Sequence, residues 1–231
     1  MKIAVIPARG GSKRIPKKNI KMFHGVPMIS YAIKAAQESE IFDAIYVSTD
    51  DNEIKDIAVS LGAEVPWLRT SELSDDHATT VDVMRDAVRN LSSASINTDL
   101  VCCIYATTPF LKPIFLAEGL RIIQEENWDY VLSASRADTP PERFFSLAES
   151  SSVELLFPEH ELTRTQDLPL RYRDAGQFYW GKRTSWESGL SIFSSKSTIV
   201  EIPRDSAIDI DTPEDWDYAS RLFAMKRIKL K

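Results

Sequence analysis

The sequence predicts an α/β protein with a mostly parallel, doubly wound, Rossmann-like sheet. Strand-like and helix-like patterns alternate through the first two-thirds of the 231 residues, which is typical of a parallel sheet with helices on both faces. Residues 100–105 are continuously apolar, as expected of a strand that is buried on both sides. Ligands of such sheets collect at the carboxyl ends of the strands, so we expect a site near Pro7, Asp50 and Thr107.

The expected elements follow the chain in order. Apolar runs predict strands at residues 3–7, 44–49, 100–106, 130–134, 178–181 and 199–202. Helical spacing of apolar residues predicts helices at residues 28–39, 53–61 and about 115–126, and a last helix from Pro213. A further helix is expected after Thr79, because Thr79 and Asp82 are spaced as in a capping box.

The regular alternation stops at about residues 138–174. The adjacent Pro140 and Pro141 and three consecutive serines interrupt this stretch, yet it keeps large apolar residues at Phe144, Phe145, Leu155, Leu156 and Phe157. So many apolar side chains are unfavourable in water. We therefore expect one domain of residues 1–231 with an inserted dimerisation arm that packs against a second subunit. A solvated surface insertion is the alternative.

Composition excludes several classes of protein. The formal net charge of −6 disfavours binding to a nucleic acid through the overall field. The apolar runs fall well short of the ~20 residues that cross a membrane, and the chain begins with a strand pattern instead of a signal peptide. We expect a cytoplasmic protein with no nucleic-acid or membrane partner. Cys102 and Cys103 lack metal-ligand or disulfide spacing and are interpreted as core residues.

The first 21 residues contain seven lysines and arginines and no acidic residue. In an acidic protein this cluster indicates a local anion site, although a solvated basic loop is the alternative. Gly10 and Gly11 allow the backbone to approach a phosphate and direct N–H groups toward it. Ser12 adds a hydroxyl, and Arg9 and Lys13 add positive charge. The Walker spacing is absent, so we predict a nucleotide-phosphate site of another kind.

Asp209 and Asp211 form a second constellation late in the chain. Residues i and i+2 of an extended strand face the same side, so both carboxylates would be presented to a Mg²⁺ ion that also takes phosphate oxygens. Thr212 and Pro213 are suited to begin a helix, and capping alone explains Thr212 and Asp215. It does not explain Asp209, which lies between two isoleucines and would be costly to bury as an ion.

Three segments together resemble the acylneuraminate cytidylyltransferase family. They are residues 8–14 (ARGGSKR) with Lys18 and Asn19, residues 47–51 (VSTDD), and residues 209–213 (DIDTP), so the resemblance spans nearly the whole chain. Residues 163–168 and 174–181 resemble the pseudaminic acid branch of that family. The resemblance implies a nucleotidyltransferase that depends on CTP and Mg²⁺ and activates an acidic nine-carbon sugar. It also implies a homodimer in which part of the arm reaches the partner's active site.

Matched position by position, the resemblance assigns the candidate site. The nucleotide is expected to contact Ala8, Arg9, Gly10, Gly11, Ser12, Lys13, Lys18, Asn19, Arg69 and Thr80, of which the last two match the cytidine contacts. The metal pair matches Asp209 and Asp211, and catalysis is expected from Lys13, Asp211 and Arg9. The sugar is expected to contact Tyr105, Thr107, Arg164, Gln166, Arg173, Gln177 and Tyr179.

Tyr105 departs from the family pattern. The sialic acid branch has a glutamine that contacts the sugar where this chain has Tyr105, which argues against N-acetylneuraminate as substrate. Packing at a strand end explains Tyr105 equally well. Arg164, Arg171 and Arg173 are the candidates of the arm for the sugar carboxylate. Gln177 and Tyr179 share one strand face and are candidates for the acyl groups, although packing explains Tyr179 as well.

The expected reaction is an in-line displacement at the α-phosphorus of CTP by the anomeric hydroxyl of the sugar, with pyrophosphate as the leaving group. Asp211 is the candidate base, directly or through the metal. CMP-pseudaminate is the expected product, destined for surface glycans, and CMP-sialate, CMP-legionaminate and CMP-KDO are the alternatives. A nucleotide-sugar glycosyltransferase, which also uses an Asp-x-Asp metal pair, and a non-catalytic nucleotide sensor are the rivals from other classes.

Overall fold

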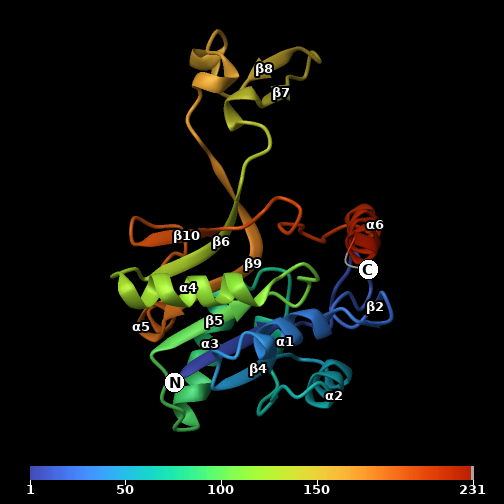
Figure 1. The fold of residues 1–231 in the computed structure, drawn as a ribbon, viewed down its shortest axis with the longest axis vertical. Helices are drawn as coiled ribbons and strands as arrows, with labels where there is room; N and C mark the ends of the chain where they lie inside the picture. Colours follow the sequence, from blue (N-terminus) through green and yellow to red (C-terminus); the bar gives the residue numbers. More distant parts are fainter. Residues whose placement is uncertain (230–231) are drawn as a thin grey trace.

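The computed structural model describes residues 1–229, which form a six-stranded sheet in the order β10-β6-β9-β5-β1-β4 (Figure 1). Its strands are β1 (Lys2–Pro7), β4 (Ala44–Ser48), β5 (Leu100–Ile104), β6 (Tyr130–Arg136), β9 (Tyr172–Lys182) and β10 (Ser197–Glu201). All neighbours pair in parallel except β9, which runs antiparallel to β5 and β6. The predicted α/β fold with a mostly parallel sheet is confirmed.

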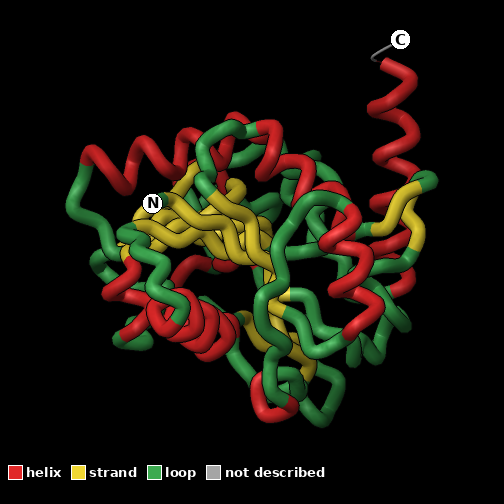
Figure 2. The backbone as a smooth tube through the Cα atoms, turned by 90° about the horizontal axis from the view of Figure 1, so that it is seen from below, coloured by secondary structure: helices red, strands yellow, loops and turns green. Residues whose placement is uncertain are grey.

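Helices cover both faces of the sheet, and Figure 2 shows the strands between them. One buried cluster joins the sheet to α1 (Ile29–Glu38), α2 (Asn52–Ser60) and α4 (Pro113–Glu125). A second cluster joins the opposite face to α3 (Thr80–Ser93) and α5 (Arg183–Glu187). Cys102 and Cys103 are both fully buried and belong to different clusters, so their interpretation as core residues is confirmed.

Local capping fixes where the helices begin. Asp51 caps α2 by accepting hydrogen bonds from the amides of Glu53 and Ile54. Thr79 caps α3 and accepts from the amide of Asp82 at 3.2 Å, as the capping-box pattern predicts. The last helix, α6 (Pro213–Lys229), follows a reciprocal cap between Thr212 and Asp215. Within residues 1–229 no helix is both long and apolar enough to cross a membrane.

The helix α6 ties the N-terminal basic segment to the segment that carries Asp209 and Asp211. A third buried cluster contains Ile15, Ile210 and Trp216. It also contains Phe23 from the short hairpin of β2 (Met22–Phe23) and β3 (Val26–Pro27). Because these apolar contacts join chain segments almost 200 positions apart, they place the two predicted chemical groups side by side.

Residues 137–171 project from the sheet as an arm between β6 and β9 (Figure 1). The arm holds a hairpin of β7 (Phe145–Leu147) with β8 (Val153–Leu155), and three 3-10 turns, η2 (Pro141–Arg143), η3 (Pro158–His160) and η4 (Thr165–Asp167). The sequence placed the arm at about residues 138–174, and the last three of these residues belong to β9, which begins at Tyr172. The chain leaves the sheet after β6 and returns beside it, so β9 runs antiparallel to its neighbours.

Candidate active site

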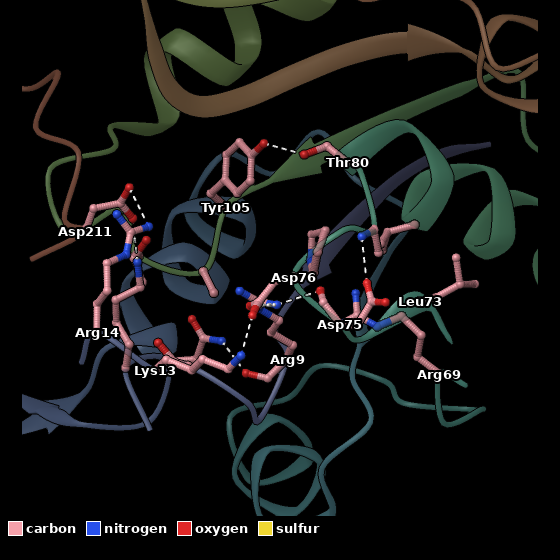
Figure 3. A pocket seen from close by; sticks show the side chains of 18 residues that line it. Arg9, Lys13, Arg14, Arg69, Leu73, Asp75, Asp76, Thr80, Tyr105 and Asp211 are labelled. Carbon is pink, nitrogen blue, oxygen red and sulfur yellow. Dashed lines mark hydrogen bonds and ion pairs between the residues drawn. The ribbon is translucent and has the colours of Figure 1, made fainter. Parts of the chain in front are cut away.

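A cavity of about 540 Å³ opens at the carboxyl ends of β1 and β5 (Figure 3). Ten predicted site residues line it: Arg9, Ser12, Lys13, Lys18, Asn19, Arg69, Thr80, Tyr105, Thr107 and Asp211. The position agrees with the rule that ligands of parallel sheets bind beyond the carboxyl ends of the strands. The cations of the N-terminal loop and the carboxylate of Asp211 therefore face one common space, as the sequence predicts.

Asp76 holds two of the predicted phosphate-binding cations. Its carboxylate lies 2.9 Å from Arg9 and 2.5 Å from Lys13, and Arg9 also donates to the carbonyl oxygen of Asp75 at 2.6 Å. Hydrogen bonds from Lys13 and then Arg9 lower the pKa of Asp76 below its usual range. An anion between Arg9 and Lys13 is therefore electrostatically favoured, which is the property that a phosphate site requires.

Two further cations of the basic segment, Arg14 and Lys18, contact Asp211. The carboxylate lies 2.9 Å from Arg14 and 3.1 Å from Lys18. Lys18 also donates to the carbonyl oxygen of Ile210 at 2.6 Å and is largely shielded from solvent. The basic N-terminal segment thus reaches directly to the segment that precedes α6.

Gly10 serves a different purpose from the predicted one. Its amide donates to Asp50 Oδ1 at 3.0 Å, so this N–H is already satisfied by a carboxylate and is not directed to a phosphate. A Cβ atom at Gly10 would lie 2.5 Å from Asp51 Oδ2, which shows that the loop must pass close to the end of β4. Ala8 is fully buried, so only its backbone is available to a nucleotide.

Substitution of Gly10 with alanine is expected to disturb both the loop and the cap of α2. The new Cβ would meet the Asp51 side chain, whose carboxylate caps that helix, so a loss of about 1 kcal/mol of stability is expected together with weaker nucleotide binding. Thermal melting and calorimetric titration with CTP measure the two effects. Gly11→Ala is the matched control, because a Cβ there meets no atom within 4 Å. Equal effects of both variants would contradict this account.

Two predicted nucleotide residues are buried in the cavity wall. Asn19 is 8% exposed and donates to the carbonyl oxygen of Arg9 at 2.9 Å, so it fixes the shape of the basic loop. Arg69 is 6% exposed, donates to Ser74 Oγ at 3.2 Å and lies 3.9 Å from Asp50. Burial lowers the pKa of Arg69, and the charge of Asp50 opposes that change.

Thr80 and Tyr105 meet on the side of the cavity away from Lys13 and Arg14 (Figure 3). Their hydroxyl oxygens are 2.6 Å apart. Burial raises the pKa of Tyr105, and hydrogen bonds with Thr80 and Tyr179 oppose the rise. The uncharged side chains of Leu73 and Val83 also line the cavity.

A second cavity of about 300 Å³ adjoins the first. The two share Lys18, Tyr105, Thr107 and Asp211 as lining residues. The second cavity adds Asp174, Gly176, Tyr179 and Asp209. Asp211 and Lys18 therefore lie at the junction of two spaces, an arrangement that allows two different molecules to meet beside the same carboxylate.

Asp209 and Asp211 converge without forming the predicted strand. Residues 208–211 have no regular secondary structure, yet both side chains line the second cavity. Asp209 keeps contact with solvent while Ile210 is buried, so only part of the predicted cost of burying Asp209 arises. Partial shielding from water, and then repulsion by Asp211, raise the pKa of Asp209, while Lys18 opposes the rise.

The two carboxylates fit a Mg²⁺ ion that is shared with a substrate. No cluster of three or more acidic, histidine or cysteine side chains able to hold a metal occurs in residues 1–229. Mg²⁺ is commonly bound by one or two carboxylates and takes its remaining ligands from water and substrate phosphates. The mutual repulsion of Asp209 and Asp211 would be relieved by such a cation.

The structure separates the predicted sugar contacts into three groups. Tyr105, Thr107 and Tyr179 line the second cavity. Gln177 is fully buried, and its amide donates to the carbonyl oxygen of Ser206, so the prediction that it faces the cavity is wrong. Arg173 donates to the carbonyl oxygen of Ala207 at 2.8 Å and does not line either cavity within the described chain.

Arg164 and Gln166 lie on the arm and line neither cavity of the same chain. Arg164 is exposed and pairs with Asp167 at 2.6 Å. Gln166 lines a separate cavity at the base of the arm. These two residues can serve the candidate site only if the arm of another subunit brings them there.

Two acidic residues of the site, Asp76 and Asp174, were not predicted from the sequence. Asp76 lies on the loop before α3 and contacts Lys13, which is 63 positions away. Asp174 lines the second cavity and accepts a hydrogen bond from the Tyr179 hydroxyl. Asp174 belongs to the segment that carried the branch resemblance, and this was the only sequence signal that pointed to it.

Comparison with known proteins agrees with this geometry. A family model described as cytidylyltransferase matches residues 3–230. The pseudaminic acid cytidylyltransferase of Campylobacter jejuni is 39% identical over 96% of this chain and 95% of its own length. N-acylneuraminate cytidylyltransferase A of Danio rerio is 35% identical over 94% of this chain and 50% of its own length.

A solved structure shows the same fold. The CMP:2-keto-3-deoxy-manno-octonic acid synthetase complexed with CTP has a TM-score of 0.71, covering 97% of this chain and 99% of that one at 16% identity. The family match extends over nearly the entire chain, and the predicted motifs meet at one end of the sheet. The chain therefore belongs to the cytidylyltransferase family and is a nucleotidyltransferase.

Proposed function

We propose that this nucleotidyltransferase joins CMP from CTP to a free nonulosonic acid, specifically pseudaminic acid, and releases pyrophosphate. The observation that carries the proposal is the pair of adjoining cavities with Lys18 and Asp211 at their junction. One cavity has the cations that a triphosphate needs. The other has the carboxylates that a shared Mg²⁺ needs, next to space for a second substrate.

The nucleotide would lie along the larger cavity. Its phosphates would replace the Asp76 carboxylate between Arg9 and Lys13, with Ser12 and Lys18 beside them. Its base would lie near Thr80 and the other lining residues that carry no charge, with Arg69 in the wall. This orientation directs the α-phosphate toward Asp211 and the second cavity.

The reaction would be an in-line attack of the anomeric hydroxyl oxygen of the sugar on the α-phosphorus. The new O–P bond forms as the bond to the pyrophosphate oxygen breaks, and Arg9 and Lys13 stabilise the charge that develops on the leaving group. Asp211 is the candidate acceptor for the hydroxyl proton. Mg²⁺ held by Asp209 and Asp211 would supply electrophilic polarisation of the phosphate oxygens.

The charges of the second cavity support a homodimer. Asp174, Asp209 and Asp211 line it with Lys18 as the one cation among its described residues. A sugar carboxylate would be repelled there unless further positive charge were added. Arg164, exposed on the arm, is suited to supply that charge from the arm of a partner subunit.

The arm also has the surface that a dimer requires. Large apolar side chains on it are exposed, among them Phe145 at 57%, Leu147 at 67%, Val153 at 60% and Leu162 at 94%. Several large exposed apolar side chains on one projecting segment are typical of a protein–protein interface. Two arms packed against each other would remove these side chains from water.

Pseudaminic acid is favoured over other acidic sugars by two observations. Identity is higher to the pseudaminic acid enzyme, at 39%, than to the N-acylneuraminate enzyme, at 35%. Tyr105 lines the sugar-facing cavity in the place where the sialic acid branch has glutamine. A tyrosine and a glutamine offer different shapes and hydrogen bonds, so they favour differently substituted sugars.

A panel of sugars tests the proposal directly. We expect pyrophosphate release with CTP, Mg²⁺ and pseudaminic acid, with kcat/KM at least ~10-fold above that for N-acetylneuraminate, a legionaminic acid or KDO. Reactions without sugar are the control. Release of a nucleoside diphosphate would indicate a glycosyltransferase, and CTP binding without turnover on any sugar would indicate a nucleotide sensor.

A further inference from the structure

The loop before α3 places an anion of the protein itself between the cations of the first cavity. This loop spans residues 70–79 and includes the short turn η1 (Ser71–Leu73). The Asp76 carboxylate has Oδ1 2.9 Å from Arg9 and Oδ2 2.5 Å from Lys13 (Figure 3). Each oxygen thus binds a different cation, as neighbouring phosphate groups of a polyphosphate would.

The carboxylate of Asp76 is present as a charged group. Hydrogen bonds from Lys13 and then Arg9 lower its pKa, so it is ionised at neutral pH and competes with any other anion for the same two cations. Asp75 also lines the cavity, but its carboxylate accepts from the amides of His77 and Ala78, both at 2.8 Å. The charge of Asp75 is used within the turn, whereas that of Asp76 faces the predicted phosphate-binding cations.

The attachment of the loop does not depend on Asp76 alone. Arg9 also donates to the carbonyl oxygen of Asp75 at 2.6 Å, and the two hydrogen bonds to the Asp75 carboxylate hold the turn that follows. The Asp76 side chain is 43% exposed. It can therefore turn into water when a phosphate takes its place, while the backbone of the loop stays attached to Arg9.

The exposure of the two ion pairs limits how strongly Asp76 can oppose a ligand. The side chain of Lys13 is 80% exposed and that of Arg9 is 37% exposed, and ion pairs so open to solvent contribute little individually. A ligand with several negative charges that spans both cations can therefore displace the single carboxylate, but it binds less tightly than it would without this competition. A ligand whose phosphate does not reach both cations escapes the competition.

We propose that Asp76 is an internal competitor of pyrophosphate, which weakens the binding of this product at Arg9 and Lys13 and so limits product inhibition. The inference rests on the proposed function, in which these two cations hold the leaving group. Cations that stabilise the charge on the leaving group also retain pyrophosphate after the reaction. Asp76 binds them again as pyrophosphate departs, and the same competition acts on the triphosphate of CTP.

Binding of pyrophosphate to the full chain tests the proposal. Dissociation constants for pyrophosphate and for CMP are measured by calorimetry on the unmodified protein and on the variants Asp76→Asn and Asp76→Ala. Removal of the competing charge is expected to tighten pyrophosphate binding ~10-fold, as for the loss of two exposed ion pairs. Binding of CMP should not change, because its one phosphate does not span both cations. The inhibition constant of pyrophosphate should fall together with its dissociation constant.

Two further variants separate the charge of Asp76 from other effects of the substitution. Glu72→Gln removes one negative charge from an exposed position on the same loop that does not line the cavity, so its pyrophosphate binding should equal that of the unmodified protein. Asp76→Glu keeps a carboxylate beside the two cations and should restore weak binding. Asp76 is exposed and lies outside the helices and strands, so these variants should fold, which circular dichroism checks.

The outcomes separate this inference from the function on which it rests. If the unmodified protein binds CTP and pyrophosphate, and Asp76→Asn binds pyrophosphate no more tightly, the role of Asp76 is overturned and the proposed function stands. An unmodified protein that binds neither ligand would overturn both. Equal tightening by Asp76→Asn and Glu72→Gln would reduce the effect to net charge and also overturn the inference. Tighter pyrophosphate binding by Asp76→Asn and Asp76→Ala, with Glu72→Gln and Asp76→Glu unchanged, would support it.

Discussion

Asp211→Asn is expected to lower the rate of pyrophosphate release at least ~100-fold at saturating CTP and sugar. Asparagine keeps the shape of the side chain and removes its charge. That charge pairs with Arg14 and Lys18 and, in the proposed mechanism, holds Mg²⁺ with Asp209. The charge pairing and the metal binding both act on the phosphate at which the reaction takes place. The loss of activity should therefore appear in kcat and not only in the KM for CTP.

The fold should survive this substitution. The cap of α6 is made by Thr212 and Asp215, and Asp211 contributes only its backbone amide to it. Circular dichroism and thermal melting should therefore remain close to those of the unmodified protein. Asp217→Asn, which removes the same charge from an exposed position on α6, is the matched control and should retain full activity. Undiminished turnover by the Asp211 variant would contradict the proposed metal role.

The parts of the fold that were predictable are those with a repeated pattern. Continuous apolar runs identified the buried strands, and caps such as Thr79 identified where helices begin. The antiparallel direction of β9 was not predictable, because strand direction depends on the path of the arm and leaves no trace in side-chain composition. The hairpin of β2 and β3 has two residues in each strand, too few to show any period.

The site was predictable where a residue type alone implies chemistry. Glycines beside cations, and two aspartates beside a helix start, indicated phosphate and metal binding before any geometry was known. Asp76 could not be found in this way, since its role comes from a contact with Lys13 across 63 positions. Proximity of that kind is a product of the tertiary fold.

Gln177 shows how a correct rule can fail locally. Alternation along a strand puts Gln177 and Tyr179 on one face, which led to the prediction that both contact the sugar. Gly176 has φ of +58°, and the pairing of β6 with β9 shifts register between Leu132 and Ala134. Such irregularities break the period of two that the rule assumes, and Gln177 lies in the core.

The arm leads to the second large prediction, which concerns activity between subunits. In the proposed dimer, Arg164 of one subunit binds the sugar at the cavity of the other. Arg164→Ala should therefore raise the KM for the sugar by ~30-fold or more, as expected when one partner of a shielded charge pair is removed. The KM for CTP should change little, because Arg164 is expected to contact the sugar and not the nucleotide.

Mixing two defective chains tests whether the arm acts on the partner. In a mixed dimer of Arg164→Ala with Asp211→Asn, one site combines an intact core with an intact arm, and the other site carries both defects. Random exchange gives mixed dimers as half of the population, so about one quarter of the unmodified activity should return. Two differently tagged chains, purified together through both tags, establish that mixed dimers have formed.

A mixture of Arg164→Ala with Gln166→Ala is the matched control. Both changes lie on the arm, and each site of the mixed dimer then receives one defective arm, so no activity above the mean of the two variants should return. If activity returns in the first mixture and not in the second, the arm and Asp211 of one active site must come from different chains. If verified mixed dimers of the first pair regain nothing, the arm serves its own chain or none. The negative charge of the second cavity would then have to be balanced by another source.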